Sequence, residues 1–151
     1  MPSPGRGHVN PMMNLCKLLV ARDETIHVTF VVTEEWLGFI GSDPKPDRIC
    51  FGALPNVVPS ELVRAANMDA FVEAVMTKME DPFERLLDRL EPTGKPRLII
   101  ADSFLHWAVG VGNRRGIEVA SFWPMPPSAF SVFYHSHLLE KNGHFPADLA
   151  G

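Results

Sequence analysis

Two glycines and a histidine stand together in the segment Pro4–Pro11 (PGRGHVNP), just before a helical pattern. Ligands of open α/β sheets bind where a strand ends and a helix begins. Glycine lets the backbone approach a ligand closely, and histidine exchanges a proton readily near neutral pH. His8 is therefore a candidate general base with Gly7 beside it, and a solvent-exposed histidine in a glycine-rich turn is the alternative.

Asp102 is the second residue that could take part in a reaction, because it directly follows the apolar stretch 98–101 (LIIA). A carboxylate at the carboxyl end of a strand faces the same crevice as the glycine loop. Asp is also a good helix N-cap, so capping alone is an alternative. A cap would turn toward the amide of Phe104 or Leu105, whereas an orienting acid would lie ~2.6–3.2 Å from a ring nitrogen of His8.

A dinucleotide-binding loop is a rival interpretation of the same glycines. Gly5 and Gly7 supply two of the three glycines of that fingerprint, and Glu34 stands where an acid would hold a ribose hydroxyl. The third glycine is replaced by Asn10, and Pro11 would crowd the helix–strand packing that glycine permits. The match is weak.

The elements that must position these residues follow from apolar patterning. Strand-length apolar stretches alternate with longer stretches of helical period, which is typical of βαβ units that build a parallel sheet flanked by helices. The pattern predicts strands over 26–32, 48–51, 98–101 and 117–122, and helices over 11–22, 68–90, 104–115 and 128–141. We expect Asn10 to cap the first helix, Pro82 to kink the second or restart it under an Asp81 cap, and helices to end at Gly116 and Gly143.

Composition excludes several classes of protein. With 46% apolar and 21% charged residues the 151-residue chain is expected to fold. A net charge of −4 argues against nucleic acid, and no apolar run reaches the ~18 residues of a membrane span. Cys16 and Cys50 lack CxxC spacing and no Asn-x-Ser/Thr site occurs, which favours a reducing compartment and predicts a cytoplasmic location. His135 and His137 are two apart on a predicted helix, so we expect no metal site.

Both ends of the chain look cut. Only Met1–Ser3 precede the glycine loop, and the chain stops at Gly151 where a doubly wound domain would continue. We therefore expect residues 1–151 to be part of one Rossmann-like α/β domain whose sheet lacks a member.

Three segments also carry a family resemblance: GRGHVNP at 5–11, ADSFLHW at 101–107, and the stretch from Phe122 to Pro146. Together they resemble the N-terminal region of plant secondary-product UDP-glycosyltransferases, and the last stretch resembles their family 87. The resemblance runs over essentially the whole chain in matching order. It covers only about the first third of such an enzyme.

The resemblance implies a GT-B fold, in which two Rossmann-like domains face a cleft. It implies inverting transfer of a hexose, with glucose as the expected sugar, from a UDP-sugar donor to a small apolar or phenolic acceptor. His8 would be the base and Asp102 the acid that orients it, with no metal or other cofactor. The C-terminal UDP-sugar-binding domain would be absent, so we expect the chain, as a monomer, to be inactive alone.

Candidate acceptor-binding residues are Gly7, Phe104, Trp107, Trp123 and Phe130. The sequence departs from the family at Pro124, where many members have a Thr or Ser that approaches the donor. Two other functions stay open: a non-catalytic remnant that binds acceptors, and a nicotinamide-dependent oxidoreductase.

Overall fold

The computed structural model describes residues 1–144, and for Thr93 it describes the backbone but not the side chain. Its elements follow in the order α1 (Arg6–Arg22), β1 (Val28–Thr33), α2 (Glu34–Ile40), β2 (Ile49–Leu54), η1 (Arg64–Ala66), α3 (Met68–Thr77), α4 (Glu80–Leu90), η2 (Glu91–Thr93), β3 (Leu98–Asp102), α5 (Trp107–Arg115), β4 (Glu118–Phe122), α6 (Pro127–Tyr134) and α7 (Ser136–Lys141). The elements η1 and η2 are 3₁₀ turns. Among the described residues, no helix is both long enough and apolar enough to cross a lipid bilayer.

The strands form two separate parallel ladders. β1 pairs with β2, with Val28 opposite Ile49, and β3 pairs with β4, with Leu98 opposite Glu118. The N-terminal segment lies beside β3: the Met1 amino group donates to the carbonyl of Ile100 at 2.5 Å, and the Asp102 amide donates to the Met1 carbonyl at 2.9 Å. The predicted parallel pairing is confirmed, and each described strand is paired with one other.

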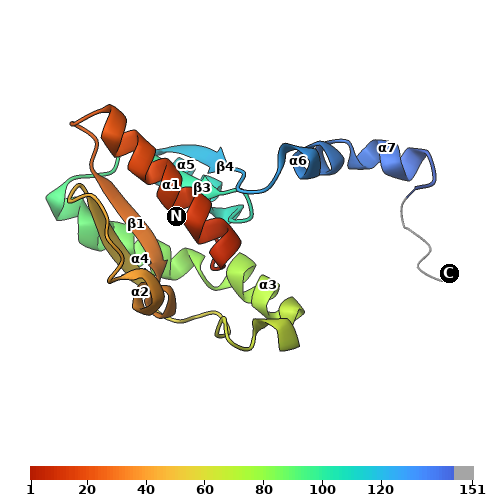
Figure 1. Ribbon diagram of the computed structural model, residues 1–151, viewed down its shortest axis with the longest axis horizontal. Helices are drawn as coiled ribbons and strands as arrows, with labels where there is room; N and C mark the ends of the chain where they lie inside the picture. The colour runs from red at the N-terminus through yellow and green to blue at the C-terminus, as the bar shows by residue number, and fades with distance from the viewer. Residues whose placement is uncertain (145–151) are drawn as a thin grey trace.

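Helices cover both faces of these strands, as the βαβ pattern predicts (Figure 1). Phe30 and Val32 of β1 belong to the core cluster that includes the buried side of α1, whereas Val31 belongs to the cluster with α3, α4 and α5. This alternation follows from the period of two along a strand. The result is a three-layer α/β body from which α6 and α7 extend (Figure 1).

The start of α1 differs from the prediction. The helix begins at Arg6 rather than Pro11, and Gly5, not Asn10, is its N-cap. The Gly5 carbonyl accepts hydrogen bonds from the amides of His8 at 2.9 Å and Val9 at 2.8 Å, which closes the first turn. Pro11 lies inside the helix and removes one interior hydrogen bond, a cost that burial of Val9, Met12, Cys16 and Val20 offsets. His8 therefore stands in the first turn of a helix, not in a loop.

The predicted break in the long helix is present, but the predicted cap residue is wrong. α3 ends at Thr77 and α4 begins at Glu80, with Met79 rather than Asp81 at the N-cap position. Pro82 lies in the first turn of α4, where its missing amide proton would have no helical acceptor. Asp81 lies in the same turn, where the helix dipole favours a carboxylate.

Three further boundaries depart from the prediction. α2 forms where no helix is predicted, held by the Thr33 hydroxyl, which accepts from the Trp36 amide at 3.3 Å, and by burial of Trp36. α5 starts at Trp107 because residues 103–106 form a turn, and the last predicted helix is divided at His135. Gly116 and Gly143 have positive φ of 58° and 71°, as predicted for helix ends.

Candidate active site

His8 and Asp102 are in direct contact although 94 residues separate them in sequence. The Nδ1 atom of His8 lies 2.8 Å from Oδ2 of Asp102, inside the predicted range. The His8 side chain is 26% exposed and the Asp102 side chain is fully buried. The pair therefore has a buried carboxylate behind an imidazole that solvent, and hence a ligand, can reach.

The Asp102 carboxylate makes both the contact expected of a helix cap and the contact expected of an acid that orients His8. Its Oδ1 accepts from the Phe104 amide at 3.0 Å, as a cap does, while Oδ2 meets His8 and also accepts from the Ser3 amide at 3.3 Å. Three hydrogen bonds to a carboxylate compensate the loss of water around a buried charge. Capping and orienting are thus compatible, because each uses a different oxygen.

The fold brings the pair together through backbone pairing at the N-terminus. Asp102 is the last residue of β3, and its amide bonds to the Met1 carbonyl. Met1, Ser3 and Pro4 are buried, so this short segment is held beside β3 and delivers His8 to its carboxyl end.

This geometry favours one tautomer of a neutral imidazole. An ionised carboxylate only accepts hydrogen bonds, so Nδ1 of a neutral His8 carries the proton and Nε2 keeps its lone pair. A ring held in this tautomer can take a proton at Nε2, and the carboxylate then stabilises the cation. The arrangement is suited to general-base chemistry.

A run of aromatic rings leads away from His8. The rings of His8 and Phe104 meet edge to face at 5.5 Å, Phe104 stacks on Trp123 at 6.0 Å, and Trp123 meets Phe130 at 5.5 Å. We call Phe104, Trp123 and Phe130 the aromatic row. Phe104 and Trp123 are half-buried and Phe130 is exposed. The structure thus joins three of the predicted acceptor-binding residues to the candidate base.

Trp107 and Gly7 lie elsewhere. The Trp107 side chain is in the core, where Nε1 donates to the Val75 carbonyl at 3.0 Å and the indole packs against Phe83 at 5.6 Å. Trp107 is therefore not part of the aromatic row. Gly7 is exposed on the first turn of α1, and a Cβ there would meet no atom within 4 Å.

Four other histidines lie outside this constellation. His27, His106, His135 and His137 are all exposed. Within residues 1–144, no group of three or more His, Cys, Asp or Glu side chains could hold a metal ion. Pro124 is half-buried next to Trp123.

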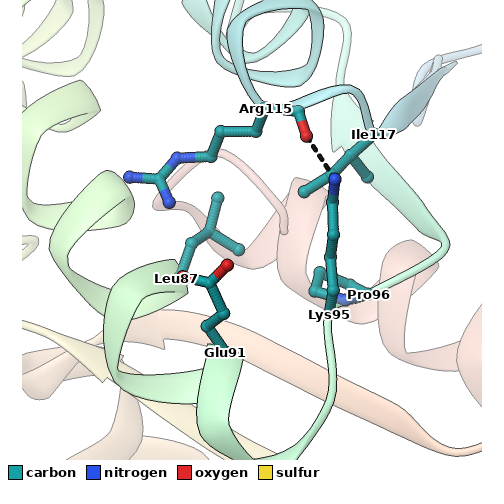
Figure 2. A pocket seen from close by; sticks show the side chains of 6 residues that line it. All are labelled: Leu87, Glu91, Lys95, Pro96, Arg115 and Ile117. Atoms are coloured by element: carbon teal, nitrogen blue, oxygen red, sulfur yellow. Dashed lines mark hydrogen bonds between the residues drawn. The ribbon is translucent and has the colours of Figure 1, made fainter.

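A hollow at the opposite end of β3 contains none of the predicted site residues. It is lined by Leu87, Glu91, Lys95, Pro96, Arg115 and Ile117, and Lys95 donates across it to the Arg115 carbonyl (Figure 2). The candidate base is therefore not in this hollow.

Sequence reasoning missed two contacts of the site. Ser3 donates its amide to Asp102, and Arg64 donates to the Pro4 carbonyl at 3.4 Å. Neither residue type nor spacing indicates these contacts, because both depend on how distant segments meet.

Comparison with known proteins identifies relatives. No family model matches the chain. UDP-glycosyltransferase 87A1 of Arabidopsis thaliana is 61% identical over 98% of the chain, which covers 33% of that protein. The chain thus spans about a third of the length of this relative.

Solved structures give the same fold. An anthocyanidin 3-O-glucosyltransferase in complex with UDP superposes with a TM-score of 0.77 at 21% identity, over 97% of this chain and 34% of that one. Os79 of O. sativa, in complex with U2F and trichothecene, gives 0.73 at 22% identity, over 89% and 31%. These folds are of the GT-B class. In sequence and in fold, the chain is similar to the plant UDP-glycosyltransferases, and it spans about a third of the length of these relatives.

Proposed function

We propose that this chain is the acceptor-side part of a UDP-sugar-dependent glycosyltransferase in which His8 is the catalytic base. The observation that carries the proposal is the 2.8 Å contact between His8 Nδ1 and the buried Asp102 carboxylate. The sequence relative is named a UDP-glycosyltransferase, and the structural relatives are an anthocyanidin 3-O-glucosyltransferase with UDP and Os79 with U2F and a trichothecene.

In the proposed reaction, Nε2 of His8 takes the proton of an acceptor hydroxyl as its oxygen attacks the anomeric carbon of the sugar. The bond from that carbon to UDP breaks and UDP leaves, so the configuration inverts. Asp102 stabilises the imidazolium that forms, and the proton passes to solvent in the next step. These steps need no metal or other cofactor, and UDP-sugar is a substrate.

The aromatic row supports a small apolar or phenolic acceptor. A planar ring could stack on Phe104 or Trp123 with its hydroxyl near the exposed edge of His8. Glucose is the proposed sugar, by analogy with the glucosyltransferase relative.

The donor is proposed to be held by the part of the relatives that this chain does not span. The 151-residue chain alone, which we propose to be monomeric and cytoplasmic, would then transfer no sugar. Residues 1–151 would be part of the N-terminal acceptor-binding domain, and a separate C-terminal domain would bind UDP-sugar.

The test joins this chain to the remaining two-thirds of the Arabidopsis relative and measures transfer from UDP-glucose to a panel of phenols. We expect His8→Ala to lower kcat by at least ~100-fold with little change in KM, as for a group that acts in the transition state. His27→Ala, at an exposed position, is the matched control and should keep full activity. A His8→Ala protein with near-normal turnover would remove His8 from the mechanism.

A second candidate is a binding protein that retains the aromatic row without catalysis. Acceptor binding by the 151-residue chain, with no transfer by the joined protein, would favour it. The oxidoreductase alternative predicts a change of intrinsic fluorescence on addition of NAD(H) but not of UDP-glucose.

A further inference from the structure

The Pro4–Gly5 segment, which directly precedes the helix that carries His8, is contacted by the cation of Arg64. Nη1 of Arg64, the first residue of η1, lies 3.4 Å from the Pro4 carbonyl oxygen and 2.9 Å from Oε2 of Glu61. Its guanidinium lies over the ring of Phe71, 5.4 Å from the centroid, and its side chain is 30% exposed. Three different contacts therefore fix the end of this long side chain.

Gly5 is where Arg64 and His8 come close to each other. A Cβ atom at Gly5 would lie 2.9 Å from Nη1 of Arg64 and 3.5 Å from Cδ2 of His8. The guanidinium thus occupies the space that any other residue at position 5 would need. Because φ of Gly5 is 165°, an extended value open to all residues, the requirement for glycine is one of space and not of backbone strain.

The segment that presents Arg64 is itself anchored. The Glu35 carboxylate, on α2, accepts from the Ser60 hydroxyl at 2.5 Å and from the Glu61 amide at 3.0 Å. Glu61 then pairs with Arg64. A continuous set of polar contacts runs from α2 through residues 60–64 to the Pro4–Gly5 peptide.

We propose that Arg64 is a positioning residue for His8. Asp102 fixes the direction of the ring, but the place of the His8 backbone depends on the first turn of α1, whose hydrogen bonds end on the Gly5 carbonyl. Arg64 donates to the carbonyl of the preceding peptide, Pro4–Gly5, and so holds the chain just before this turn. It acts through this peptide and touches neither the acceptor nor the donor. The importance of this position for catalysis rests on the proposed role of His8 as base.

The first test uses the 151-residue chain and is independent of activity. We expect Arg64→Gln to speed hydrogen exchange of the Val9 amide by about 10-fold and to shift the ¹⁵N resonances of the His8 ring. Arg64→Lys keeps a donor for the Pro4 carbonyl and should restore part of both effects. Arg114→Gln is the matched control, since it removes an exposed arginine that pairs with Glu80 and Glu84 and should change neither.

The second test uses the space at Gly5. Gly5→Ala should move the guanidinium, because the end of a flexible side chain yields more easily than the backbone, and so should reproduce the Arg64→Gln spectrum. In the double variant, the spectral effects of Gly5→Ala and Arg64→Gln should not add. Additive effects, or His8 signals that are unchanged in Arg64→Gln, would overturn the proposal.

In the joined protein we expect Arg64→Gln to lower kcat about 10-fold with KM changed less than 2-fold, because small displacements of a base slow the reacting step. Full activity of Arg64→Gln in a protein that His8→Ala inactivates would refute the positioning role and leave the proposed function intact. If His8→Ala is harmless while the spectral effects of Arg64→Gln are present, the proposed function fails and the structural part of this inference stands.

Discussion

The body of the chain, residues 1–122, and the arm, residues 123–144, have similarly apolar sequences but opposite environments. Phe30 and Leu54 in the body are 1% and 0% exposed, whereas Phe133 and Tyr134 in the arm are 62% and 67% exposed. No residue of α6 or α7 is buried, and both helices extend away from the body (Figure 1). A helical sequence with apolar residues is thus not enough for burial, which also needs a second element to pack against.

The proposed site crosses the boundary between these regions. The His8–Asp102 pair belongs to the body, where strand pairing and core packing hold it. The aromatic row begins at Phe104 in the body and ends at Phe130 in the arm. The proposed base and the proposed acceptor contacts therefore lie on parts of the chain with very different packing.

The largest expected effect comes from emptying a core position. Phe83→Ala should lower the free energy of unfolding by about 3–5 kcal/mol, because Phe83 is 3% exposed and packs against Trp107. Phe133→Ala in the arm should change it by less than about 0.5 kcal/mol. Urea unfolding of both variants checks this, and equal losses would mean that the arm is packed as the body is.

Adding one carbon tests how tightly the body is packed. A Cβ at Gly112 would lie 2.2 Å from Cγ2 of Val119 and 2.7 Å from the Ile117 carbonyl oxygen, so Gly112→Ala should cost about 3 kcal/mol. Gly38→Ala is the control, because a Cβ there meets nothing within 4 Å and alanine favours α2 by up to about 1 kcal/mol. Unchanged stability of Gly112→Ala would contradict the close packing of α5 on β4.

The buried amino group of Met1 is expected to make the free energy of unfolding depend on pH. Burial lowers the pKa of the Met1 amino group from 8.0 to about 6. Between these values the unfolded state binds more protons than the folded state, so the free energy of unfolding should rise with pH from 6 to 8, by at most about 3 kcal/mol. The loss of unfolding free energy that comes from burying the charged amino group is therefore complete below pH 6. A chain extended before Met1, with an amide in place of the amine, should lose this dependence, and a persistent slope would assign it to other groups.

The smallest effect concerns the junction. Trp36 and Trp107 are 2% and 9% exposed, whereas Trp123 is half-buried, so acrylamide should quench mainly Trp123. We expect Trp123→Phe to remove most of the quenchable emission and to change stability by less than about 0.5 kcal/mol. Quenching that persists in Trp123→Phe would indicate that a body tryptophan is accessible.

Much of the fold was predictable because its signals are local. The β-branched run in β1, the apolar stretch of β3 and the helical stripe over α3 and α4 each identify an element by period and length. The start of α1 was not predictable in this way, since Asn10 and Pro11 satisfy the usual rules for a helix beginning. The helix extends back to Arg6 because the Gly5 carbonyl accepts hydrogen bonds from the amides of His8 and Val9.

The sequence by itself determined the α/β class, the alternation of strands and helices, and the two residues that form the candidate dyad. It did so because periodicity and residue chemistry are properties of short segments. Only the tertiary structure decided that Asp102 contacts both the Phe104 amide and His8, that Trp107 packs in the core while Phe104 faces His8, and that Arg64 reaches the Pro4 carbonyl. Each of these depends on which distant segments meet, and the direction of a side chain at such a meeting is set by packing and hydrogen bonds across the fold, not by its neighbours in sequence.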